Sequence, residues 1–98
     1  MTTTLAILIG NSDDKLTQRR WHEYVTAVAR VVNACAKEVH FHALSYGSDP
    51  WQNACWVLEL KDGAELGLKD MLRGACELYE QDSIAVLSGV TEFLEAPR

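Results

Sequence analysis

The sequence predicts an α+β domain in which two helices cover one face of a four-stranded antiparallel sheet. Three observations lead to this fold class: four short apolar runs typical of strands, two longer stretches whose apolar residues recur every three or four positions, and the order in which these segments alternate. The length of 98 residues, 48% of them hydrophobic and 23% charged, is that of one domain with one modest core.

The first half of the chain contains a strand, a helix and a second strand. Residues 4–9 form a short apolar, β-branched run that Gly10 closes, which is typical of a buried strand. Residues 17–36 are expected to be helical, with Thr17 as N-cap and one apolar stripe made by Trp21, Tyr24, Val25, Val28, Ala29 and Val32. Residues 39–46 alternate as a half-exposed strand, with Val39, Phe41 and Ala43 on one side and His40, His42, Leu44 and Tyr46 on the other.

The second half of the chain also contains a strand, a helix and a strand. Residues 47–50 are dense in turn formers, so we expect residues 39–46 and 53–60 to form a hairpin. Residues 64–80 have the helical period, at Leu68, Met71, Leu72, Ala75, Leu78 and Tyr79, and residues 83–88 form a last short strand. Residues 89–98 are left as a C-terminal extension that packs on the domain or on a dimer partner.

The order strand, helix, strand, strand, helix, strand is that of the split βαββαβ, or ferredoxin-like, arrangement. Right-handed crossovers place the first and third strands in the centre of the sheet. The strand directions then bring three connections to the same end, residues 10–16, 47–52 and 81–83. We call this the polar loop end. It predicts a contact surface that is made by Asn11, Asp13, Asp14, Lys15, Asp49, Trp51, Gln52, Asn53 and Asp82.

Within this surface Trp51 is the expected anchor. An aromatic side chain beside a proline turn and rimmed by polar groups is typical of a hot spot in a protein contact, whereas we assign Trp21 and Trp56 to the core. Four aspartates at the polar loop end could bind a hard cation, but they lack the pattern of a calcium loop. Aspartate, asparagine and serine in turns also bond their own backbone, so a structural polar network is the favoured interpretation.

His40 and His42 are the weak candidates for a metal site. Two positions apart on one face of a strand, they could both reach a metal ion, with a third ligand from the neighbouring strand, Cys55 or Glu59. The hairpin register decides this, because an even residue sum pairs His42 with Trp56, whereas an odd sum places it beside Cys55 or Val57. The alternative is a pair of surface histidines, and we assign neither a metal nor a cofactor.

Charge and cysteine usage exclude several classes of function. A net charge of −5 makes binding to nucleic acid or to an anionic membrane surface unfavourable. Three cysteines at wide spacings fit free thiols in a reducing compartment, and with no signal peptide or membrane span we expect a cytoplasmic protein. Catalysis by Cys55 would need an orienting residue and an oxyanion hole that no motif announces.

Four segments, GNSDDKLTQ, PWQNACW, QDSIA and TEFL, together resemble the pattern of short uncharacterised bacterial proteins, over nearly the whole chain. This resemblance implies a small cytoplasmic domain and carries no named activity. The topology also resembles small dimeric ferredoxin-like domains, among them antibiotic-biosynthesis-type monooxygenases, but the chain has no match to the site residues of those enzymes.

We therefore predict a protein-interaction or regulatory module rather than an enzyme, with its contact surface at the polar loop end. The sheet face without helices would carry Ala, Leu, Val, Cys or Trp side chains, which is too apolar to be left to water. We expect a second copy to cover it, through the sheet face or edge, or else the C-terminal segment of residues 90–94. The competing prediction is a small-molecule-binding or enzyme domain with a pocket between sheet and helices, using His40, His42, Cys55 or the aspartates.

Overall fold

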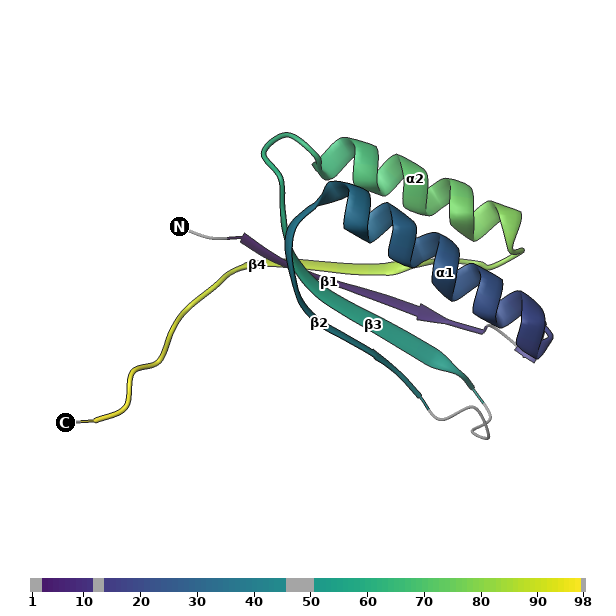
Figure 1. Cartoon of the computed structure of the whole chain (residues 1–98), viewed down its shortest axis with the longest axis horizontal. Coiled ribbons are helices and arrows are strands. Elements are labelled where there is room, and N and C mark those ends of the chain that lie inside the picture. Colours follow the sequence, from purple (N-terminus) through teal and green to yellow (C-terminus); the bar gives the residue numbers. More distant parts are fainter. Residues whose placement is uncertain (1–2, 12–13, 46–50, 98) are drawn as a thin grey trace.

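The computed structural model describes residues 3–11, 14–45 and 51–97. In chain order the elements are β1 (Thr3–Gly10), α1 (Gln18–Cys35), β2 (Ala36–Leu44), β3 (Asn53–Leu60), α2 (Glu65–Leu78) and β4 (Ala85–Val90). The strands form one antiparallel sheet in the order β2-β3-β1-β4, and both helices lie on the same side of it (Figure 1). The predicted ferredoxin-like α+β fold is thus confirmed, with β1 and β3 in the centre.

Helix α1 begins where its capping residue predicts. The side-chain oxygen of Thr17 accepts a hydrogen bond from the backbone N–H of Arg20 at 3.2 Å, which satisfies one of the free donors of the first turn. At the other end the chain passes directly from Cys35 into β2, because Ala36 already has extended dihedrals. Strand β2 therefore starts three residues earlier than expected, and β4 starts and ends two residues later.

The core lies between the two helices and the sheet face that they cover, which we call the covered face. Alternate residues of β1 and β3 point to it, and they meet the apolar stripes of both helices. The buried members of this core include Leu5, Ile7, Ile9, Trp21, Tyr24, Val28, Trp56, Leu58, Leu68 and Leu72. Each large apolar side chain that is fully buried contributes about 1.5–3 kcal/mol. Trp21 and Trp56 are core residues, as the sequence predicts.

A bulge in β2 changes which of its side chains share a face. The register against β3 shifts at two places, and at the second of these His40 is the extra residue. Val39 pairs with the buried Leu58, whereas Phe41 pairs with a residue of the opposite face, and Ala43 follows Phe41. The expected grouping of Val39, Phe41 and Ala43 on one side is therefore wrong, because a strict period of two has no place for a bulge.

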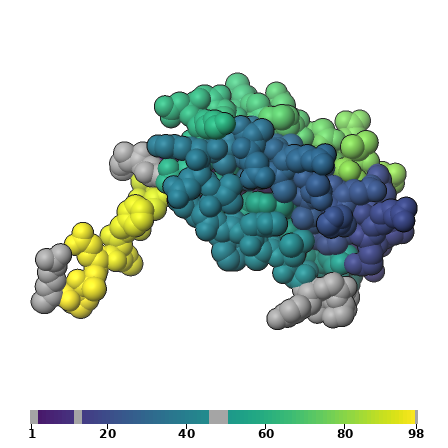
Figure 2. Space-filling model, in the orientation of Figure 1, coloured from purple at the N-terminus to yellow at the C-terminus, as the bar shows by residue number. Residues whose placement is uncertain are grey.

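Residues 91–97 follow β4 without forming a helix or a strand. They lead away from the body of the domain, as the yellow segment in Figure 2 shows. The hydroxyl groups of Thr4 and Thr91 share a hydrogen bond at the start of the segment. Further along it Phe93 and Leu94 are 81% and 86% exposed, so that both apolar side chains are accessible to a partner.

Candidate functional site

The polar loop end is held together by a buried asparagine. The backbone N–H of Asn11 donates to the carbonyl of Gln52 at 2.9 Å, which ties the end of β1 to the start of β3. The Asn11 side chain then accepts from the N–H of Leu16 at 2.9 Å and donates to the Leu16 carbonyl at 3.0 Å. These two bonds take the place of backbone–backbone hydrogen bonds across the connection to α1. The role of the Asn11 side chain is therefore structural.

Gln52 is the second buried amide at this end. Its side chain makes two reciprocal hydrogen bonds with Gln18 at the start of α1, of 2.9 Å from Gln52 to Gln18 and 3.2 Å in the other direction. Burying an amide is costly unless its donors and acceptors are paired, and these bonds meet that need. Asn11 and Gln52 therefore connect the loops to one another rather than presenting polar atoms to a ligand.

Trp51 differs from its buried neighbours. Its side chain is 67% exposed, and its backbone has a positive φ of 62°, which is uncommon for a residue with a bulky side chain. The Asn53 amide donates to the Trp51 carbonyl at 2.5 Å, and the Asn53 backbone N–H donates to the Ser45 hydroxyl at 2.9 Å. The indole is thus exposed next to a backbone carbonyl that the Asn53 side chain holds in place.

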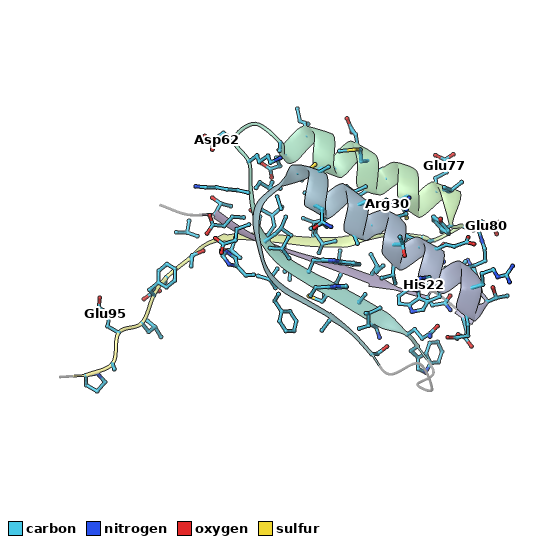
Figure 3. All side chains as sticks on the ribbon, in the orientation of Figure 1. His22, Arg30, Asp62, Glu77, Glu80 and Glu95 are labelled. Carbon is cyan, nitrogen blue, oxygen red and sulfur yellow. The ribbon has the colours of Figure 1, made fainter. Side chains whose placement is uncertain are left out.

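The charged residues of the polar loop end are spread over its surface. Asp14 has a positive φ of 54°, and its backbone N–H donates to the carbonyl of Asn11. Lys15 and Asp82 approach to 3.9 Å with side chains that are 40% and 77% exposed, and such an exposed pair contributes little to stability. Asp13 and Asp49 lie outside the described residues. In Figure 3 this end is marked by Glu77 and Glu80, close to the end of α2.

The two histidines of β2 lie on opposite faces of the sheet. The observed register pairs His42 with Trp56, and the two rings stack at 4.6 Å with an angle of 7° between their planes. Beyond the bulge, the His40 imidazole instead approaches the Glu59 carboxylate on the other face, with 3.2 Å between Nε2 and Oε1. The expectation that both histidines share one face is wrong, whereas Glu59 is indeed beside His40.

The environment of the Cys76 thiol does not favour a nucleophile. Cys35 and Cys76 are buried, and the Cys76 Sγ donates to the carbonyl of Gln81 at 3.1 Å. Burial, and to a smaller extent the charge of Asp82, raises the pKa of the Cys76 thiol. A raised pKa disfavours the thiolate that a nucleophile needs. A cavity of about 440 Å³ lies beside this thiol, between α2 and the β4 side of the sheet.

An apolar surface lies on the sheet face opposite the helices, which we call the open face. Two rows of cross-strand neighbours run across all four strands of this face. One row consists of Phe41, Val57, Ala6 and Leu87, and the other of Ala43, Cys55, Leu8 and Ala85. We call these eight side chains the apolar band. Its three largest exposed members are Leu8 at 39%, Phe41 at 53% and Leu87 at 64% exposure.

Polar rows border the apolar band on both sides. Towards the polar loop end the next row contains Ser45 and Asn53, and towards the opposite end it contains Glu38, Glu59 and Thr4. An apolar centre with a polar rim is the usual anatomy of a protein interface. The sequence predicts an apolar open face, but it could not give the membership of the band, since Phe41 and Ala43 join it through the bulge.

Solved structures share this fold. A dimeric ferredoxin-like protein of unknown function from Thermobifida fusca has 14% identity and a TM-score of 0.54, with 92% of each chain covered. A protein from Arabidopsis thaliana has 10% identity and a TM-score of 0.58, covering 98% of this chain and 100% of the other. The hydroxynitrile lyase from Passiflora edulis has 12% identity and a TM-score of 0.50, covering 96% and 98%. At these identities the likeness shows the fold alone.

No family model and no curated protein matches the sequence. Among the described residues, neither helix has the length and the apolar character that crossing a membrane would require.

Proposed function

We propose that this chain is a self-associating interaction module, which forms a homodimer by packing the open face of one copy against the open face of another. The observation that supports this most is the apolar band, which spans the whole width of the sheet. A contiguous apolar surface rimmed by polar residues marks an interaction site on a soluble protein. No single exposed leucine would support the proposal, because isolated apolar residues are common on protein surfaces.

A second copy of the chain is the occupant that this surface fits best. In a two-fold dimer the same patch is used on both subunits, so an apolar band that contacts its own copy is buried twice by one interface. The Thermobifida fusca protein, which has this fold, is described as dimeric. The band also contains no charged residue, so that packing it against a copy of itself buries no ion without a partner.

The C-terminal segment gives the dimer a second contact. Residues 91–97 leave the sheet at the end of β4, at its edge, and carry Phe93 and Leu94 with most of their surface exposed. We expect these two side chains to pack on the partner subunit, where they would extend the apolar interface. Folding back over the open face of the same chain is the other arrangement, and it would leave the protein monomeric.

The test is the mass of the protein in solution for two charge substitutions. Phe41→Asp places a carboxylate in the apolar band and should convert a particle of twice the 10.9 kDa chain mass into a monomer. The matched control is Leu66→Asp on α2, a leucine that is more exposed than Phe41 but lies outside the band, and this variant should stay dimeric. A monomeric control variant, or a dimeric Phe41→Asp protein, would place the interface elsewhere.

Apart from the dimer, Trp51 supports a contact with a different protein at the polar loop end. Its exposed indole lies beside backbone groups that hydrogen bonds hold in place, so part of the backbone freedom is already lost before binding. In this proposal the homodimer presents two copies of the surface that includes Trp51, Asp14, Lys15 and Asp82. A partner of this surface should bind the unchanged protein and lose binding to the Trp51→Ala variant.

A further inference from the structure

Two carboxylates face each other across neighbouring strands at the end of the open face away from the polar loop end. Glu38 of β2 and Glu59 of β3 are cross-strand partners, in the polar row that borders the apolar band. Like charges that lie directly opposite each other destabilise a sheet, and they do so more when part of the surface around them is shielded from water. Glu59 is the more shielded of the two, since only 22% of its side chain is exposed. A positive charge between the two carboxylates would relieve this repulsion.

The bulge in β2 places the His40 imidazole beside both carboxylates, with a different ring nitrogen nearest to each. His40 Nε2 lies 3.2 Å from Glu59 Oε1, and His40 Nδ1 lies 4.0 Å from Glu38 Oε1. One donor atom from each of the three residues lies within 4.8 Å of the other two. Two ligands of a tetrahedral zinc ion, each about 2.0–2.1 Å from the metal, are about 3.4 Å apart, which is close to the observed separation of His40 and Glu59.

We propose that Glu38, His40 and Glu59 form a binding site for a divalent transition-metal ion of the zinc type. An imidazole nitrogen with two carboxylate oxygens is a donor set that zinc accepts, and water can complete a tetrahedron around the ion. Calcium and magnesium fit this set less well, because both prefer oxygen ligands only. His40 would bind the metal through one ring nitrogen, which leaves the other free to donate a hydrogen bond.

Other charged groups near the site set limits on its affinity. Lys37, Lys61, Asp62 and Glu65 line the same shallow cavity of about 320 Å³ as Glu59. The ammonium group of Lys61 is directed to the backbone carbonyl of Ala34 at 3.2 Å. Glu38 is largely exposed and must turn towards the ion, at some cost in side-chain freedom. The site depends on β2 and β3 of one chain and does not require the proposed dimer.

A calorimetric titration of the chelator-treated chain with Zn²⁺ tests the proposal. We expect one Zn²⁺ per chain. The affinity should fall by at least about tenfold in His40→Asn and in Glu59→Gln, since even the loss of a residue that only hydrogen-bonds to a metal ligand costs about 10–100-fold. Glu38→Gln changes an exposed side chain, should fold normally, and should lower the affinity as well. Co²⁺ used in place of Zn²⁺ should give visible absorption bands that His40→Asn loses.

The control is His22→Asn, which removes an exposed histidine on α1, on the other side of the sheet (Figure 3). This variant should bind Zn²⁺ as the unchanged protein does. The proposal is overturned if the unchanged protein binds no Zn²⁺, if His40→Asn and Glu38→Gln bind as well as it does, or if His22→Asn loses as much affinity as they do. Leu87→Asp, which places a charge in the apolar band on the other edge strand, away from His40, should still bind Zn²⁺, because the site lies within one chain.

Discussion

The two faces of the sheet have a similar apolar character but different surroundings. On β1, Ile7 points to the covered face and is fully buried, whereas the next residue, Leu8, points to the open face and is 39% exposed. The two helices cover the face to which Ile7 points. No helix among the described residues covers the open face, so the apolar band is better explained by association than by the stability of one chain.

The strongest way to test this difference is to truncate the two neighbouring residues separately. Ile7→Ala should lower the free energy of unfolding by about 2–5 kcal/mol, because it leaves a cavity among core side chains. Leu8→Ala should cost far less in the monomer, but it should weaken the dimer. Denaturant unfolding at low and high protein concentration measures both effects. Equal losses for the two variants at low concentration would show that the open face belongs to the monomer core.

A second prediction concerns Tyr24, on the covered side of the sheet, and the free energy of unfolding at alkaline pH. Burial raises the pKa of the Tyr24 hydroxyl above its ordinary value of 10.0, and the nearby Cys76 adds to the shift. The unfolded chain therefore releases this proton at a lower pH than the folded chain does. Below pH 10 the group has no effect on the pH dependence, and above it the free energy of unfolding should fall by up to about 1.4 kcal/mol per pH unit.

Tyr24→Phe should remove this part of the decrease in the free energy of unfolding above pH 10. At neutral pH the variant should be as stable as the unchanged protein or slightly more so, because the Tyr24 hydroxyl is buried and has no hydrogen-bond partner among the described residues. Urea unfolding at several pH values between 8 and about 11 gives both quantities. An unchanged slope in the variant would mean that the hydroxyl is not held in a water-excluded environment.

The smallest expected effect on stability is at Trp51. Since its side chain is mostly exposed, Trp51→Ala should change the free energy of unfolding by no more than about 0.5 kcal/mol, as for other surface substitutions. Thermal or chemical unfolding measures the change. A loss of 2 kcal/mol or more, about the value of a core side chain, would assign the indole to packing and withdraw it from the proposed contact surface.

The fold could be predicted from the sequence because its signals are local. The apolar stripe of α1, its N-cap at Thr17 and the alternation of β3 each follow from a few neighbouring residues. The strand order then follows from the handedness of the crossovers. The start of β2 could not be predicted in the same way, because Ala36 continues the chain from helix to strand with no turn former to mark the change.

The candidate sites were harder to predict because they depend on register. One bulge at His40 places this residue beside Glu59 and sends His42 to Trp56 on the covered side. The same bulge puts Phe41 into the apolar band. At the polar loop end, the residue types suggested a contact surface, but Asn11 and Gln52 are buried amides that bond to one another's loops. Only their positions in three dimensions separate structural polar residues from accessible ones.

Cys55 gives the most direct test of the central claim, that the open face is buried between two copies. Its thiol lies in the apolar band, partly exposed in a single chain, whereas Cys35 is buried in the core and Cys76 is buried beside the cavity next to α2. Alkylation of Cys55, followed by peptide mass analysis, should be slow where the protein has the mass of a dimer, and faster on dilution and in Phe41→Asp. A protein of dimeric mass whose Cys55 is alkylated as fast as in Phe41→Asp would contradict the account.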